Sequence, residues 1–162
     1  MVRIGIDDFI QHVIGPVTRV EMKMPGDKIK KGDVVLSLIQ KGKQLKIYAP
    51  VSGTVKEQNS LLFSDSTVIN SSPYSEGWVY MVEPSNWLRE IQFFDMAEKY
   101  RKSLQNEFSR LKDFLSTSLK VNKVEYEHVV LQDGGALRNG ILEDLGPEVW
   151  EDFQQEFLDQ NI

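Results

Sequence analysis

The 162-residue sequence contains no cysteine, which excludes disulfides, thiolate nucleophiles and cysteine-bound metal centres. No apolar run approaches the roughly 18 residues of a membrane helix, and the first residues lack the continuous apolar stretch of a signal peptide. The only two histidines, His12 and His128, lie far apart in the sequence and have no second ligand at metal-binding spacing. We therefore expect a cytoplasmic protein without a metal site, in which each histidine is structural or exposed.

Patterns of catalysis and phosphate binding are also missing. Asp7 with Asp8, and Glu151 with Asp152, are adjacent pairs whose side chains point apart on a helix, so they do not form an acid/base couple. The glycine-containing segments "GDKIKKGD" and "QDGGALRNG" lack the GxxxxGK[ST] order of a phosphate-binding loop. The sequence therefore favours a protein that is not an enzyme.

The charges that are present are distributed unevenly along the chain. Residues 1–60 carry a net charge of +4 and residues 61–162 a net charge of −9, within an overall net charge of −5. The lysines of the first part are spread over expected strands and lack the interleaved aromatic residues of a base-stacking surface. We expect no nucleic-acid binding, and interpret the basic part as a solvated face or one that meets an acidic protein partner.

The chain changes its periodicity near Pro84. Before it, short alternating segments separated by glycine turns predict a β-sandwich or barrel, interrupted by one short helix over residues 7–15. After it, apolar residues recur every three or four positions from Met96 to Leu119, which predicts a long amphipathic helix. A short strand over residues 127–135 and a helix over residues 146–160 with Pro147 in its first turn are expected to follow.

The most specific signal is a set of four segments in a fixed order: "GIDDFIQ" (5–11), "IGPVTRVEMKMPGDKIKKGD" (14–33), "YAPVSGTVKEQN" (48–59) and "VINSSPYSEGWVYMVEPS" (68–85). Together they resemble the H-protein of the glycine cleavage system, within the wider biotinyl/lipoyl-attachment domain family. The resemblance covers about 80 residues. It implies a barrel-sandwich hybrid, the lipoyl-type β-sandwich, over residues 1–85, followed by a helical extension over residues 86–162.

The resemblance also implies a role without catalysis. In that family a lysine at the tip of a hairpin carries lipoate through an amide bond. The arm shuttles an aminomethyl group between decarboxylating, aminomethyl-transferring and dihydrolipoyl-reoxidising enzymes. A tethered arm of this kind raises the effective concentration of the cofactor at each partner.

The residue at the carrier position is the main departure from the family pattern. The family's lysine lies eight residues before the proline of the "SPVSG"-type turn, and counting back from Pro50 reaches Gly42, which has no amine. A one-residue slip would place Lys41 or Lys43 at the tip, but it would also turn every strand side chain to the opposite face. Glycine is moreover a natural occupant of a turn position with positive φ.

Two further positions near the tip differ from the family. Where H-proteins usually have an acid three residues before the lysine and an aspartate four residues after it, this sequence has Ile39 and Lys46. Lys46 therefore joins Lys41 and Lys43 in a basic rim, which we interpret as an interaction surface. The family's opening strand pair, with its His-x-Trp motif, has no counterpart before Val2, so these strands are expected to be missing.

The sequence thus favours a non-catalytic H-protein-like module that acts in protein interaction or assembly and carries no cofactor. The alternative is a functional lipoyl carrier, modified at Lys43 or Lys41, that serves glycine-cleavage-type enzymes.

The C-terminal segment supports two expectations that are independent of the carrier question. Residues 120–162 hold three basic and ten acidic residues. We predict that they fold back toward the basic rim of Lys41, Lys43 and Lys46 and mask it. The alternative is that the apolar stripe of residues 96–119 forms a homodimer.

Overall fold

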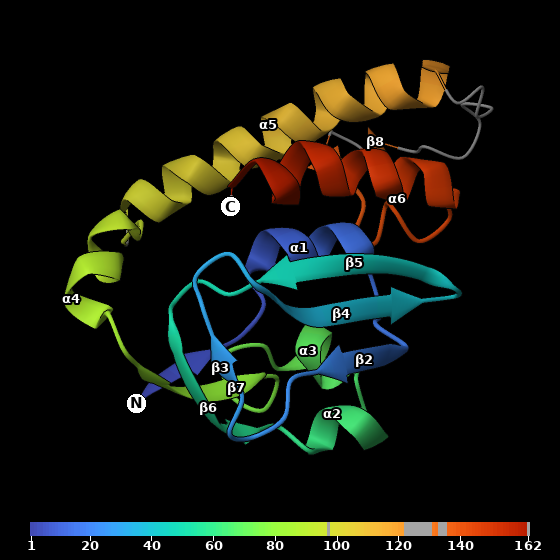
Figure 1. Ribbon diagram of the computed structural model, residues 1–162. Coiled ribbons are helices and arrows are strands. Elements are labelled where there is room, and N and C mark those ends of the chain that lie inside the picture. Colours follow the sequence, from blue (N-terminus) through green and yellow to red (C-terminus); the bar gives the residue numbers. More distant parts are fainter. Residues whose placement is uncertain (97, 122–130, 133–135, 162) are drawn as a thin grey trace.

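Two antiparallel sheets form the first half of the chain in the computed structural model, which describes residues 1–96, 98–121, 131–132 and 136–161 (Figure 1). One sheet has the order β1 (Val2–Ile4), β7 (Tyr80–Pro84), β6 (Gly53–Gln58) and β3 (Lys28–Ile29), and the other has the order β2 (Arg19–Met22), β4 (Val34–Gln40) and β5 (Lys43–Tyr48). The mainly β architecture with a long helix is confirmed. The two sheets share no strand, so closure into a barrel-sandwich stays a prediction.

The two sheets are joined by their buried side chains and by one tyrosine. Leu38 and Leu45 from one sheet and Val82 from the other are at most 1% exposed. Tyr80 of β7 is fully buried and its hydroxyl donates to the Val35 carbonyl of β4 at 2.7 Å. Burial raises the pKa of Tyr80 to about 12, so the phenol remains protonated and keeps this donor.

Three helices accompany the sheets, and one of them was expected. Helix α1 (Asp8–Ile14) begins after Asp7, whose side chain accepts from the Ile10 N–H at 2.9 Å, and ends at Gly15 with φ +69°, as its cap residues predict. The expectation that strands and turns alone fill residues 61–71 was wrong. Two single-turn helices, α2 (Leu61–Ser64) and α3 (Val68–Ser71), lie there, because four residues are too short to show a helical period.

The second half is mainly helical: α4 (Trp87–Glu90), η1 (Ile91–Phe93), α5 (Glu98–Val121), β8 (Leu131–Gln132), β9 (Ala136–Leu137), α6 (Pro147–Phe153), η3 (Gln154–Leu158) and η4 (Asp159–Asn161). Pro147 occupies the first turn of α6, as predicted. The predicted strand over residues 127–135 falls largely outside the described residues, as does His128. None of the helices described is long and apolar enough to span a membrane.

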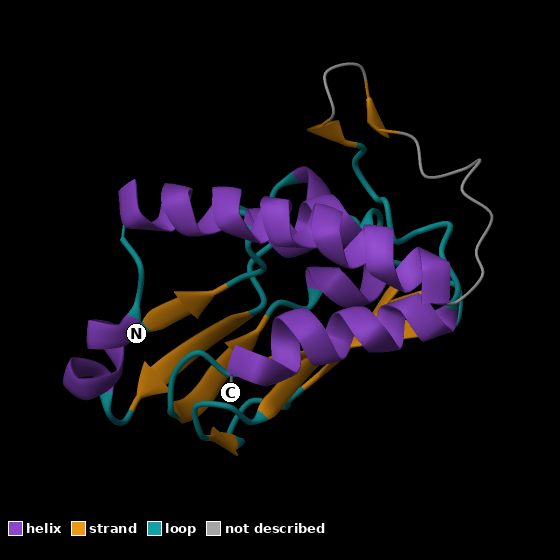
Figure 2. Cartoon of the chain, turned by 90° about the horizontal axis from the view of Figure 1, so that it is seen from above, coloured by secondary structure: helices purple, strands orange, loops and turns teal. Residues whose placement is uncertain are grey.

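The extension packs onto the β half and buries part of its apolar stripe. Helix α6 runs antiparallel to α5 (Figures 1 and 2). Helix α6 and η3 pack against β5, and α5 packs against α1 and α6. Leu111 and Leu115 of the stripe are buried. The contact is made by an aromatic cluster, whose rings lie at centroid distances of 4.7–6.1 Å: Phe9, Phe108, Phe114, Phe153 and Phe157.

The stripe is therefore used within the chain, and a homodimer through it stays a prediction. The boundary between residues 85 and 86 also stays a prediction, since both halves contribute to one buried core.

Candidate functional site

The tip of the β4–β5 hairpin consists of two residues. Gln40 pairs with Lys43, so Lys41 and Gly42 form the turn, with φ values of +49° and +80°. Positive φ at both positions is typical of a type I′ turn. No atom lies within 4 Å of where a Cβ on Gly42 would be, so the backbone conformation favours glycine there and lack of space does not require it.

The observed register corrects one sequence interpretation. Lys41 was expected to need a slip of the hairpin to reach the tip, yet it is a turn residue in the register that the structure shows. Lys43 is the first residue of β5 and points into the chain's own C-terminal segment.

The ammonium group of Lys43 is held by this segment. Its Nζ donates to the carbonyl oxygens of Leu142, Glu143 and Leu145 at 3.2, 2.6 and 2.9 Å. It also lies 4.9 Å from the ring centroid of Trp150, within cation–π range. Three acceptors match the three N–H donors of a lysine, so the hydrogen-bonding capacity of this amine is used within the fold.

The other two lysines of the rim contact the same segment in different ways. Lys41 Nζ pairs with Glu143 Oε1 at 3.0 Å, with its own side chain 62% exposed. Lys46 takes part through its backbone: its N–H donates to Gln154 Oε1 at 2.7 Å, and its carbonyl accepts from Gln154 Nε2 at 3.2 Å. Because β5 is the edge strand of its sheet, Gln154 satisfies polar groups that a free edge leaves unpaired.

The C-terminal segment is anchored to α1 as well as to the hairpin. The N–H groups of Gly140 and Leu142 donate to the carbonyls of His12 and Val13 at 2.6 and 3.0 Å. The Trp150 indole N–H donates to the Leu142 carbonyl at 2.7 Å. His12 itself contacts the Leu137 carbonyl through Nε2 at 3.1 Å, which confirms a structural role for this histidine.

The predicted fold-back of residues 120–162 onto the basic rim is thus confirmed for the part of this segment that the structure describes. The predicted masking is incomplete, because Lys41 and Lys46 stay exposed and only Lys43 is half-buried. Its physical basis differs from the one expected. Charge attraction accounts for Lys41, where Glu143 is the partner, but Lys43 is bound by carbonyl dipoles and an aromatic ring. Partial burial and repulsion from Lys41 lower the pKa of Lys43, against the opposing effect of nearby acids.

Sequence reasoning missed the residues of the segment that make these contacts. Trp150 and Gln154 lie in the helix that was expected over residues 146–160, but neither carried a signal for contact with the hairpin. Together with Gly42, Lys43 and Lys46 they line a cleft of about 430 Å³ between the hairpin and α6. Nothing in local periodicity marks which face of a helix meets a hairpin that is about 100 residues earlier in the chain.

Comparison with known proteins assigns the family. The family model for the glycine cleavage H-protein matches residues 1–107. The probable glycine cleavage system H protein of Thermococcus gammatolerans is 35% identical over 105 residues, 65% of this chain and 78% of that protein. The H protein of Halalkalibacterium halodurans is 34% identical over 106 residues, 65% of this chain and 82% of that protein. A solved H protein from Mycobacterium marinum is 26% identical, with a TM-score of 0.48, over 50% of this chain and 64% of that chain.

The chain therefore belongs to the glycine cleavage H-protein family. A member of this family is not itself a catalyst. The match ends within α5, at residue 107. The segment that binds Lys43 and the edge of β5 lies beyond it.

Proposed function

We propose that this chain is an H-protein relative that acts through protein contacts in the cytoplasm and carries no lipoate. The observation that carries the proposal is the hairpin tip. Gly42 stands eight residues before Pro50 and lies in the two-residue turn, where it offers no amine for an amide bond. The neighbouring amine of Lys43 is bound by three carbonyl groups. The residues present at the carrier position therefore do not fit lipoate.

The junction between the β half and α5 supports a role in protein contact. Leu88, Phe93 and Met96 are 81%, 71% and 70% exposed and lie within nine consecutive residues. Large apolar side chains that cluster at a surface typically mark an interaction site. The partners that the family suggests are the glycine-cleavage-type enzymes.

A second candidate function is a lipoyl carrier modified at Lys41. It is favoured by one observation, which is that Lys41 is a turn residue with an exposed side chain and a single surface ion pair. Surface pairs of this kind contribute about 0–1 kcal/mol, so the amine is accessible at small cost. Lys43 fits this role less well, because its three hydrogen bonds would have to break first.

Intact mass spectrometry distinguishes the two candidates. The chain is co-expressed with a lipoate ligase and lipoate, with the Halalkalibacterium halodurans H protein in the same cells as a positive control. We expect the control to gain a lipoyl group and this chain to keep its unmodified mass. A lipoyl adduct that disappears in Lys41→Ala or in Lys43→Ala would replace the proposal with the carrier function.

Calorimetric titration tests the interaction role itself. The unmodified chain is titrated with each purified glycine-cleavage-type enzyme, and we expect binding to at least one. The double variant Leu88→Ser with Met96→Ser should weaken that binding, whereas Phe63→Ser, which alters an equally apolar side chain that is 57% exposed on α2, should not. Absence of binding to every enzyme, or equal effects of both variants, would contradict the role.

A further inference from the structure

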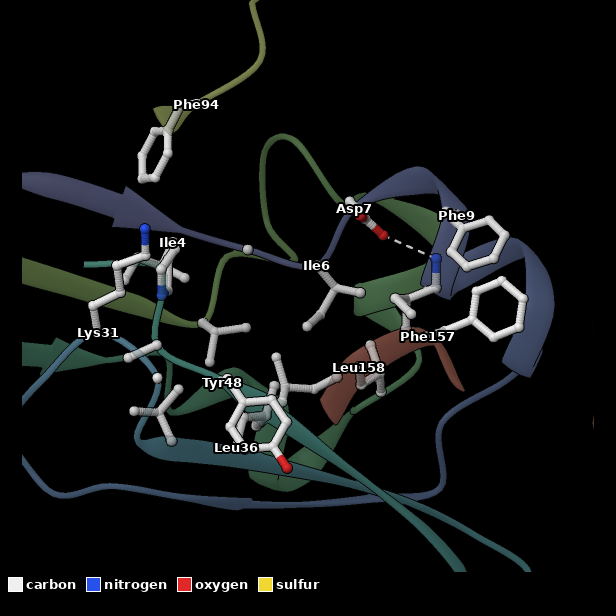
Figure 3. Close-up of a pocket in the computed structure, with 18 of the residues that line it drawn as sticks. Ile4, Ile6, Asp7, Phe9, Lys31, Leu36, Tyr48, Phe94, Phe157 and Leu158 are labelled. Carbon is white, nitrogen blue, oxygen red and sulfur yellow. Dashed lines mark hydrogen bonds between the residues drawn. The ribbon is translucent and has the colours of Figure 1, made fainter. Parts of the chain in front are cut away.

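A cavity of about 480 Å³ lies between the β half and the extension, away from the hairpin tip (Figure 3). Its volume falls within the range of about 300–1,000 Å³ that is typical of small-molecule sites. Side chains from both halves line it, so it exists only when the extension is packed in place. The family match covers most of the lining on both sides, and Phe157 and Leu158, beyond position 107, complete the wall.

The wall of the cavity is mainly aliphatic and aromatic. The β half contributes Ile6, Leu36 and Ile47, and the extension contributes Phe94, Leu104 and Leu158. Leu36 is buried, whereas Ile47, Phe94, Leu104 and Leu158 remain partly accessible. A lining of this kind favours an apolar ligand, because each buried methylene contributes about 0.8 kcal/mol.

Polar groups on the wall are mostly satisfied within the protein. The Tyr48 hydroxyl donates to Asp159 at 2.6 Å, and the Ser103 hydroxyl donates to Asp95 at 2.5 Å. Glu107 accepts two hydrogen bonds from Arg110, at 2.8 and 3.0 Å. These side chains already have partners and need none from a ligand.

Lys31 is the exception at one end of the cavity. Its Nζ lies 4.9 Å from the ring centroid of Phe93, and it forms no ion pair with any residue in the described part of the chain. Glu90 accepts hydrogen bonds from the Ser52 N–H and hydroxyl at 2.8 and 2.7 Å, so both of its carboxylate oxygens are bound. These hydrogen bonds and the charge of Lys31 lower the pKa of Glu90.

Asp7 lies at the opposite side of the cavity from Lys31 (Figure 3). Burial and the nearby carboxylates of Asp8 and Glu107 raise the pKa of Asp7, against the hydrogen bond that it accepts from the Ile10 N–H. Negative charge on a ligand is therefore disfavoured near Asp7 and favoured near Lys31. The cavity is electrically asymmetric, with the positive charge of Lys31 beside Phe93 and partly balanced by Glu90.

We propose that this cavity binds a free monocarboxylic acid with a medium-length alkyl chain. The carboxylate meets the Lys31 ammonium beside Phe93, and the alkyl chain lies along Leu36, Ile47 and Leu104. The site is independent of lipoate attachment at the hairpin.

Titration calorimetry with a ladder of saturated acids tests the apolar part of the site. Octanoate, nonanoate and decanoate are titrated into the full chain below their micelle concentrations. We expect one site per chain and affinity that rises about fourfold with each added methylene. Absence of binding, or affinity that does not depend on chain length, would overturn the proposal.

A matched pair of lysine variants tests the polar end. Lys31→Met removes the charge and keeps the length, and Lys30→Met removes the same charge from the adjacent exposed residue that does not line the cavity. We expect Lys31→Met to weaken decanoate binding about tenfold or more, since hydrogen bonds to charged groups are worth about 1.5–3 kcal/mol. Lys30→Met should leave it within about twofold.

Two further ligands and one variant complete the design. Decanol should bind equally to the unmodified chain and to Lys31→Met, because it lacks the carboxylate. Leu104→Trp should abolish binding of both ligands by filling the cavity, with thermal unfolding as the check that the variant is folded. Equal effects of the two lysine variants, or tighter binding of decylamine than of decanoate, would refute the assignment of Lys31 as the anion-binding end.

Discussion

Replacing Lys43 by methionine should destabilise the contact between the hairpin and the C-terminal segment. The variant removes three hydrogen bonds to carbonyl groups and the interaction with the Trp150 ring. Hydrogen bonds to a charged group are worth about 1.5–3 kcal/mol and a cation–π contact about 0.5–1 kcal/mol. Methionine regains part of this by packing its side chain on the tryptophan. Methionine also avoids the desolvation cost of the partly buried ammonium, which lowers the pKa of Lys43, so we expect a net loss of about 2 kcal/mol in the free energy of unfolding.

Lys41→Met is the matched control for this experiment. It removes the same charge two positions earlier in the chain. The Lys41–Glu143 pair is solvent-accessible, so its loss should lower the free energy of unfolding by less than about 1 kcal/mol. Urea unfolding measures both variants. For a chain of this size, the expected loss in Lys43→Met corresponds to a fall in Tm of roughly 4–8 °C.

Hydrogen exchange shows where the stability is lost. The amides of Gly140 and Leu142 donate to α1, and they should exchange faster in Lys43→Met than in Lys41→Met. Equal unfolding free energies for the two variants, together with unchanged exchange at these amides, would refute the reasoning that Lys43 fastens the segment.

Three further predictions concern the rest of the fold. Hydrogen bonds from Ser52 lower the pKa of Glu90 from its ordinary value of 4.5. Glu90 therefore stabilises the fold above pH 4.5 and loses this effect as the pH falls through the lowered pKa. Glu90→Gln should lower the free energy of unfolding at pH 7 and leave it unchanged in acid, as measured by urea unfolding. Gly53→Ala should cost about 1–3 kcal/mol, because its Cβ would collide with the Glu83 carbonyl oxygen; calorimetric melting measures it. Phe153→Ala should cost about 3–5 kcal/mol in the same assay, since Phe153 is fully buried.

Local features of the fold were predictable because they depend on neighbouring residues. The cap residues Asp7 and Gly15 define α1, and the apolar period over residues 96–119 defines α5. The turn at Gly42 follows from the conformation that glycine alone adopts at low cost. Each of these depends on interactions within about one helical turn or one hairpin.

The contacts of the site were less predictable, because they join parts of the chain that are far apart. The acidic character of the tail was enough to predict that it would meet the basic rim. It was not enough to predict that Lys43 would bind backbone carbonyls, since every residue has one and only the path of the chain decides which of them converge. The cavity beside Lys31 was missed for the same reason, as its wall is completed by Leu158.

The contact at Lys43 also connects the two candidate functions. A hairpin tip that presents an attached arm has to be accessible to other proteins, whereas here the edge of β5 and the amine of Lys43 are covered by residues 142–154. Weakening the contact between Lys43 and the C-terminal segment by about 2 kcal/mol should increase the population of molecules in which the edge of β5 is uncovered roughly 30-fold. If the chain is a carrier, Lys43→Met should then raise the lipoylation of the exposed Lys41, measured by intact mass, because a ligase that reaches Lys41 also has to contact the edge of β5. If the chain has no carrier role, Lys43→Met should keep the unmodified mass, even though its hydrogen exchange shows that the segment has loosened.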